Sequence, residues 1–257
     1  MTTITIAEAP PVLHALRLAD TALVLGHRLS EWTGHAPMLE EELALANIAL
    51  DLIGQARSLY AHAAALEGAG HGEDDLAYHR DAPQYRNLLL AEQPNGDFAQ
   101  TVMRQFLYSA FALPHWCALQ SLRDATLAAI AAKAEKEVAY HLRHASAWVI
   151  RLGDGTGESH DRTAAALEEL WPFTGEMFEA DAADRALIAA GIAADPAPLR
   201  AEWEATVARV LVEATLEMPA PGRWMQQGGR SGRHSEHLGH MLAVMQHLPR
   251  SYPGAVW

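Results

Sequence analysis

Hydrophobic residues recur at intervals of three and four along most of the chain, and the strict alternation typical of a strand is nearly absent. This spacing places apolar side chains on one face of a helix, so it predicts a protein built from helices. Four segments have the length needed for the centre of a four-helix bundle. They cover about residues 12–32, 38–66, 98–121 and 124–152. The expected fold is therefore all-α, a four-helix bundle with additional C-terminal helices, in one domain over residues 1–257.

Proline, glycine and N-cap residues indicate where the helices begin and end. Asp97 is a favourable N-cap for the third long helix, and Pro114 predicts a kink within it. The segment 153–155 carries two glycines and should end the fourth. Shorter helices are expected at 84–91, from 161 to before 181 with a break at Trp171-Pro172, and at 184–190, 195–217 and 236–248. Polar or glycine-rich loops are expected at 68–83 and 219–235.

The second long helix carries apolar residues on two faces. Leu45, Ile48 and Leu52 lie on one face, whereas Leu43 and Leu50 lie on another. One face can be covered by the bundle itself, so the other predicts contact with a partner subunit. In the isolated chain the same face favours self-association.

Composition and charge narrow the functional classes. The chain has 257 residues and a formal net charge of −13, which gives it no general attraction for nucleic acids. Its one cysteine, Cys117, cannot form an internal disulfide and is expected in the core of the third long helix. No apolar run is long enough to span a membrane, and the N-terminus lacks a secretory signal. We therefore expect a cytoplasmic protein that binds neither nucleic acid nor membranes.

A long-helix bundle raises the question of a di-iron carboxylate centre. Such centres take one carboxylate from each of two helices and a Glu-x-x-His pair from each of the other two. Neither Glu-x-x-His nor Asp-x-x-His occurs in this sequence, and the segment 98–123 contains no acidic residue. The pattern therefore predicts no catalytic residue and no metal site.

Remnants of such a centre are nevertheless visible. Asp20 lies on the apolar face of the first helix, Asp51 on the second, and Glu137 with His141 on the fourth. Buried carboxylates without a metal must be neutral, hydrogen-bonded or ion-paired. We interpret these residues as a structural network or a polar face.

Two further motifs have several interpretations. His234, His237 and His240 share one helix face, which favours a polar surface at an interface over a metal site. The glycine-rich loop before the last helix is not a P-loop. Its backbone N–H groups and three arginines could hold an acidic partner, the favoured interpretation, or a coenzyme A phosphate. The arginines are Arg223, Arg230 and Arg233.

Several strings resemble one known family. The segment 29–57, which begins Leu-Ser-Glu-Trp-Thr-Gly-His-Ala-Pro-Met, closely resembles the PaaC subunits of phenylacetyl-CoA epoxidases. So do Asn-Leu-Leu-Leu-Ala-Glu-Gln-Pro-Asn-Gly at 87–96, Lys-Glu-Val-Ala-Tyr-His-Leu-Arg at 136–143, Glu-His-Leu-Gly at 236–239 and the terminal Gly-x-x-Trp. The likeness runs in order along nearly the whole chain.

The resemblance implies a ferritin-like fold and a non-catalytic role in aerobic phenylacetate catabolism. In that family the di-iron centre lies in a PaaA-like sister subunit, and a reductase supplies electrons from NADPH through flavin and iron–sulfur groups. The cofactors are thus expected in partner subunits and not in this chain. The family transfers no catalytic residue to this sequence.

Three alternatives stay open at this stage. The chain could be an oxygenase in its own right, with an atypical site made of Asp20, Asp51, Glu137 and His141. It could be a ferritin-like metal store, although it lacks the ligand sets of such proteins. It could also be a free-standing coenzyme A-binding module that uses the arginine loop. Metal analysis and a titration with coenzyme A would separate these possibilities.

Overall fold

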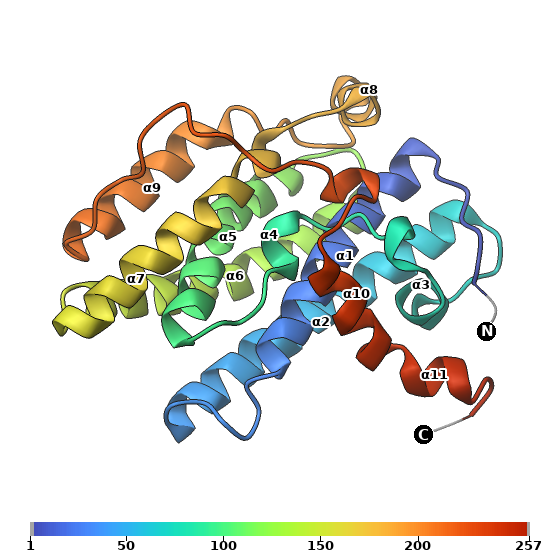
Figure 1. Ribbon diagram of the computed structural model, residues 1–257. Coiled ribbons are helices and arrows are strands. Elements are labelled where there is room, and N and C mark those ends of the chain that lie inside the picture. Colours follow the sequence, from blue (N-terminus) through green and yellow to red (C-terminus); the bar gives the residue numbers. More distant parts are fainter. Residues whose placement is uncertain (1–2, 256–257) are drawn as a thin grey trace.

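The computed structural model describes residues 3–255, and within this range all regular structure is helical (Figure 1). Four long helices form the centre: α1 (Pro10–Ser30), α2 (Leu39–Glu67), α5 (Phe98–Leu119) and α6 (Ala125–Gly153). Helix α1 packs along α2, α5 packs along α6, and α2 also contacts α6. The all-α prediction is confirmed, and the arrangement is consistent with a ferritin-like bundle.

Local sequence explains where the bundle helices begin. The Asp97 carboxylate accepts a hydrogen bond from the N–H of Gln100 at 3.0 Å and so caps α5. Asp124 caps α6 in the same way, accepting from Leu127 at 2.9 Å. These caps satisfy N–H groups that have no partner inside the helix. Helix α5 continues through Pro114, at which the sequence predicted a kink.

Seven shorter helices surround the bundle in the described part of the chain: α3 (Glu73–Tyr78), α4 (Leu89–Glu92), α7 (Gly157–Leu170), α8 (Ala182–Ala190), α9 (Leu199–Glu213), α10 (Glu236–Met245) and α11 (His247–Ser251). Helix α3 lies where a loop was expected, and it carries three acidic residues in its first turn. The helix expected at 84–91 is a 3₁₀ turn at Ala82–Gln84 followed by α4. Helices α7 and α9 pack on α5, on the side opposite to α2 (Figure 1).

One hydrophobic cluster connects residues from α1 to α10. Trp203 of α9 is buried in it, and its indole N–H donates to the carbonyl of Leu107 in α5 at 2.9 Å. Trp116 is also buried, but Cys117 is exposed because the next position of α5 points away from the cluster. The expectation of a core cysteine is therefore wrong. The terminal Trp257 lies outside the described residues.

Within residues 3–255, the helices lack the combination of length and apolar character that crossing a bilayer requires.

Candidate functional site

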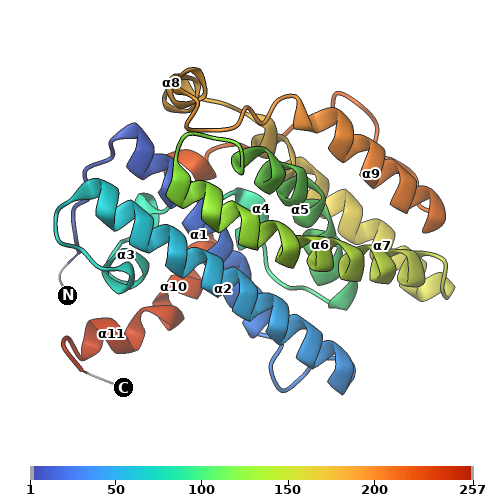
Figure 2. The same ribbon diagram turned by 180° about the vertical axis from the view of Figure 1, so that it is seen from behind.

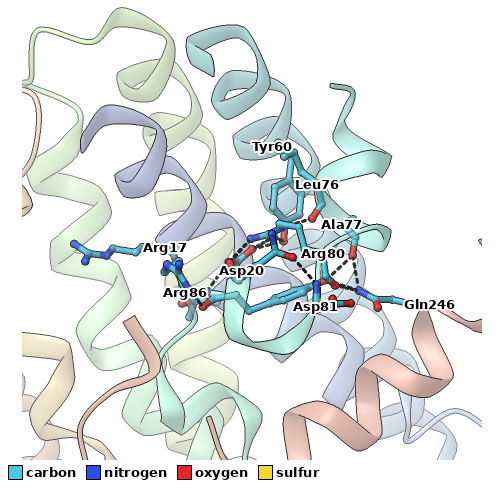
Figure 3. A network of polar contacts seen from close by, with 12 residues as sticks. Arg17, Asp20, Tyr60, Leu76, Ala77, Arg80, Asp81, Arg86 and Gln246 are labelled. Carbon is cyan, nitrogen blue, oxygen red and sulfur yellow. Dashed lines mark hydrogen bonds and ion pairs between the residues drawn. The ribbon is translucent and has the colours of Figure 1, made fainter. Parts of the chain in front are cut away.

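Asp20 lies at the centre of a buried polar network between α1, α2 and the segment after α3 (Figure 3). Its carboxylate is fully buried. It accepts from Nη1 of Arg80 at 3.0 Å, from the Tyr60 hydroxyl at 2.5 Å and from the N–H of Arg86 at 2.7 Å. Arg80 is fully buried as well and contacts both carboxylate oxygens. The network leaves Asp20 no free face toward a ligand.

The electrostatics of this network stabilise its ionised form. Burial acts to lower the pKa of Arg80, but the charge of Asp20, the nearby tyrosines and the hydrogen bond to Asp20 together outweigh it, so the pKa lies above the ordinary value. Burial and the charge of Asp20 raise the pKa of the Tyr60 hydroxyl well above its usual range, so this group stays a donor. Asp20 thus belongs to a fixed ion pair in the core.

Asp51, Glu137 and His141 belong to a second group, which bridges α2 and α6. His141 Nε2 lies 3.0 Å from Oδ2 of Asp51, and Gln55 donates to Oε2 of Glu137 at 2.9 Å. Burial lowers the pKa of His141, although the hydrogen bond to Asp51 acts in the opposite direction. Each of these two polar contacts joins α2 to α6, and we call the two contacts the α2–α6 rungs.

The structure does not bring the two groups together. Asp20 is fully buried and shares no partner with Asp51, whose side chain is 37% exposed beside α6. Within residues 3–255, no three histidine, cysteine or carboxylate side chains are grouped so that they could hold a metal ion. Of the three carboxylates that the sequence suggested as remnants of a di-iron centre, only that of Asp20 is fully buried.

The glycine-rich loop before α10 already holds an anion, which is the chain's own Glu176. The N–H groups of Gly228 and Arg230 donate to Oε1 of this buried carboxylate at 3.0 and 3.2 Å. The glycines serve close packing: a Cβ at Gly229 would overlap the carbonyl of Asn87. A phosphate would therefore have to displace Glu176 from these N–H groups.

The three arginines of this loop share no partner. Arg223 pairs with Glu168 of α7 at 2.5 Å, whereas Arg230 pairs with Asp184 of α8 at 2.8 Å. Arg233 is exposed and forms no ion pair within the described residues. The structure thus does not bring the arginines together around one anion.

The three histidines near α10 also separate. His234 lies before the helix, where Nδ1 is 2.8 Å from a Glu92 oxygen and Nε2 is 3.0 Å from the Tyr85 carbonyl. His237 is half-buried and His240 is exposed. His234 is therefore part of the internal packing, and only its two companions remain near the surface.

The outer face of α2 exposes three leucines to solvent. Exposed fractions are 67% for Leu39, 57% for Leu43 and 66% for Leu50, while Leu45 and Leu52 on the inner face are 1% or less. Helix α2 runs uncovered across the side of the molecule turned toward the viewer in Figure 2. The structure therefore leaves one of the two predicted apolar faces open. We call Leu39, Leu43 and Leu50 the α2 stripe.

Sequence reasoning missed several buried polar residues. Arg80 lay in a predicted loop, and nothing nearby in the sequence indicates that it would enter the core. His14 and His115 line a cavity between α1 and α5, and each is an isolated histidine on an apolar helix. Only their position on otherwise apolar faces could have indicated their burial.

Two comparisons with known proteins cover almost the entire chain. The sequence profile of the family described as phenylacetic acid catabolic protein matches residues 3–257. The C component of the 1,2-phenylacetyl-CoA epoxidase of Escherichia coli (strain K12) is 52% identical over 244 residues, which cover 95% of this chain and 98% of that protein. The matches agree with the resemblance found in the sequence strings. This chain therefore belongs to the phenylacetic acid catabolic protein family.

Proposed function

We propose that this chain is the C component of a phenylacetyl-CoA epoxidase and acts in it as a non-catalytic structural subunit. Its similarity to the corresponding E. coli protein supports the assignment to this complex. In this proposal, the chain pairs with a di-iron catalytic subunit and holds it in its active shape. The di-iron centre and the NADPH, flavin and iron–sulfur electron supply belong to partner subunits.

The state of the acidic residues supports a non-catalytic role. The sequence has no Glu-x-x-His pair, and α5 contains no carboxylate that could complete a di-iron site. Asp20 is committed to Arg80, and Asp51 is committed to His141. A metal would have to replace the ion pair at Asp20 or the hydrogen bond to His141 at Asp51.

The observation that carries the pairing is the α2 stripe. Leu39, Leu43 and Leu50 are more than half exposed on a helix whose opposite face is closely packed. Covering the exposed part of each leucine would contribute about 1 kcal/mol to binding. An exposed apolar stripe of this kind is more stable against an apolar face of a partner subunit than it is in water.

Co-purification with the di-iron partner tests the pairing. We expect Leu43→Lys combined with Leu50→Lys to weaken the complex at least 100-fold, because two charges would be buried in an apolar interface. The matched control is Val212→Lys combined with Val244→Lys, at exposed positions of α9 and α10. Thermal melting of each isolated variant verifies the fold. Unchanged binding by the α2 variant, or an equal loss in the control, would contradict the proposal.

A further inference from the structure

A cavity of about 60 Å³ lies between α1 and α5, on the side facing α8 and the glycine-rich loop. Its wall joins residues that are far apart in the sequence. The residues with polar groups or aromatic rings that matter here are His14 and Arg17 of α1, Tyr108, Phe111 and His115 of α5, and Arg230 of the loop. Arg230 is half-buried, so the cavity approaches the surface at the loop.

Two side chains of this wall carry buried polar atoms without a partner. His14 is 7% exposed, and neither Nδ1 nor Nε2 has a hydrogen-bond partner within the described residues. The Nε of Arg17 is likewise unpaired there, although its terminal nitrogens bind Asp181 and Asp184. Buried polar atoms are nearly always paired in folded proteins, so unpaired donors facing a cavity indicate a missing acceptor.

The unpaired guanidinium N–H in the wall favours an anion as that acceptor, because hydrogen bonds from a charged donor are strongest to a charged oxygen. Arg17, Arg86 and Arg230 line the cavity. They pair with Asp181, Asp184 and Glu8, and these pairs leave the Nε of Arg17 buried without a partner. Burial lowers the pKa of His14 to about 4, and the charges of Arg230 and Arg17 act in the same direction. The imidazole is therefore neutral at pH 7, where it still has one N–H to donate.

The rest of the wall is apolar and suits a hydrocarbon group. Phe111, Ala112, Trp116 and Met177 face the cavity, and the Phe111 ring stacks on His115 with 5.1 Å between ring centroids. One water needs about 10–15 Å³ of such a cavity, so the volume has room for about four or five non-hydrogen atoms. A ligand that satisfies both parts of the wall has a short apolar body and one charged oxygen group.

We propose that this cavity is a binding site for a small monocarboxylate of the size of acetate or propionate. The carboxylate accepts hydrogen bonds from His14 and from Nε of Arg17, and the alkyl group packs against Phe111. This site goes beyond the docking role of α2, because the cavity and the α2 stripe share no residue. Its ligand would link α1, α5 and α8 from within.

Ligand-observed NMR on the full-length chain tests the site, with acetate and propionate as probes. We expect saturable binding that weakens at least tenfold in His14→Leu, because the donor is lost. Ala112→Leu should abolish binding by filling the cavity. The matched controls are His240→Leu, at an exposed histidine, and Ala118→Leu, elsewhere on α5; both should bind like the unmodified chain.

Three results would overturn the proposal. The first is the absence of saturable binding by either carboxylate, which would mean that water alone fills the cavity. The second is unchanged affinity in both His14→Leu and Ala112→Leu, which would place the binding elsewhere. The third is displacement of acetate by chloride at equal affinity, because a site built for a carboxylate and an alkyl group should discriminate between the two.

Discussion

The Asp20–Arg80 pair shows what a buried charge does in this bundle. The two side chains are fully buried, and the carbonyl of Arg80 also accepts from Gln246 at 2.9 Å, which ties the C-terminal helices to the pair. Removing two charges from water costs several kcal/mol, so such a pair adds little net stability. Its effect is to fix which segments meet, because any other arrangement leaves a charge unpaired.

Breaking this pair from one side should be severe. We expect Arg80→Met to lower the free energy of unfolding by about 3–5 kcal/mol, because it leaves Asp20 charged and buried without a counter-ion. Urea unfolding followed by circular dichroism measures this loss. Arg57→Met is the control, since Arg57 is 74% exposed and its surface pair with Glu73 contributes at most about 1 kcal/mol. A loss no larger than that of the control would show that Asp20 is not held as an ion.

The two cavity histidines predict a specific dependence of stability on pH. Burial lowers the pKa of His14 to about 4 and that of His115 to about 3, whereas unfolded histidine titrates near 6.5. Below pH 6.5 the unfolded chain binds more protons than the folded chain, so stability falls as the pH falls. Each histidine contributes a loss of about 1.4 kcal/mol per pH unit, down to its folded pKa.

Replacing His14 isolates its share of this effect. We expect His14→Leu to lose less stability than the unmodified chain between pH 6.5 and about 4, while the two resemble each other in slope above pH 7. Unfolding measured at several pH values gives the difference directly. His240→Leu changes an exposed histidine and should leave the slope unchanged. Parallel curves for His14→Leu and the unmodified chain would show that His14 is not buried in its neutral form.

Elements differ in how well local sequence defines them. The ends of α2 and α6 agree with prediction within one residue, because long apolar periods and strong boundary residues act together. Helix α3 was missed because six residues, half of them acidic, carry no apolar period. The glycine-rich loop was recognised as irregular, but its packing against residues 83–89 depends on tertiary contacts that sequence spacing does not encode.

The packing of this loop can be tested at its glycines. A Cβ at Gly229 would overlap the carbonyl of Asn87, so we expect Gly229→Ala to cost about 1–3 kcal/mol and to loosen the loop that holds Arg230. Gly239→Ala is the matched control, because Gly239 lies within α10 with open space around its Cα. There the substitution should stabilise the chain by up to about 1 kcal/mol. Thermal melting distinguishes the two, and equal shifts would contradict the close approach of the loop.

At the scale of the whole molecule, motifs that are local in sequence can be assessed directly, whereas sites built from distant segments cannot. The lack of Glu-x-x-His and of acids in α5 could be read directly, because ligand motifs are local in sequence. The apolar outer face of α2 was also visible, since helical spacing reveals it. The cavity was not, because its wall combines α1, α5, α8 and the glycine-rich loop. Sites assembled from distant segments leave no spacing to recognise.

Iron analysis decides between a structural subunit and an oxygenase. We expect iron only when this chain is co-purified with the di-iron subunit, and none in the isolated chain, with both prepared without a nickel column. Asp51→Ala combined with Glu137→Ala should leave the iron content of the complex unchanged, because these residues pair with His141 and Gln55.

The opposite result has an equally clear meaning. If the isolated chain held about two irons per molecule and lost them in the double variant, Asp51 and Glu137 would be ligands of a di-iron site. The α2–α6 rungs would then have to open to admit the metal, and His141 would have to exchange Asp51 for iron. Retention of the rungs in the iron-loaded complex, seen as an unchanged His141 NMR signal, would instead place all of the iron in the partner.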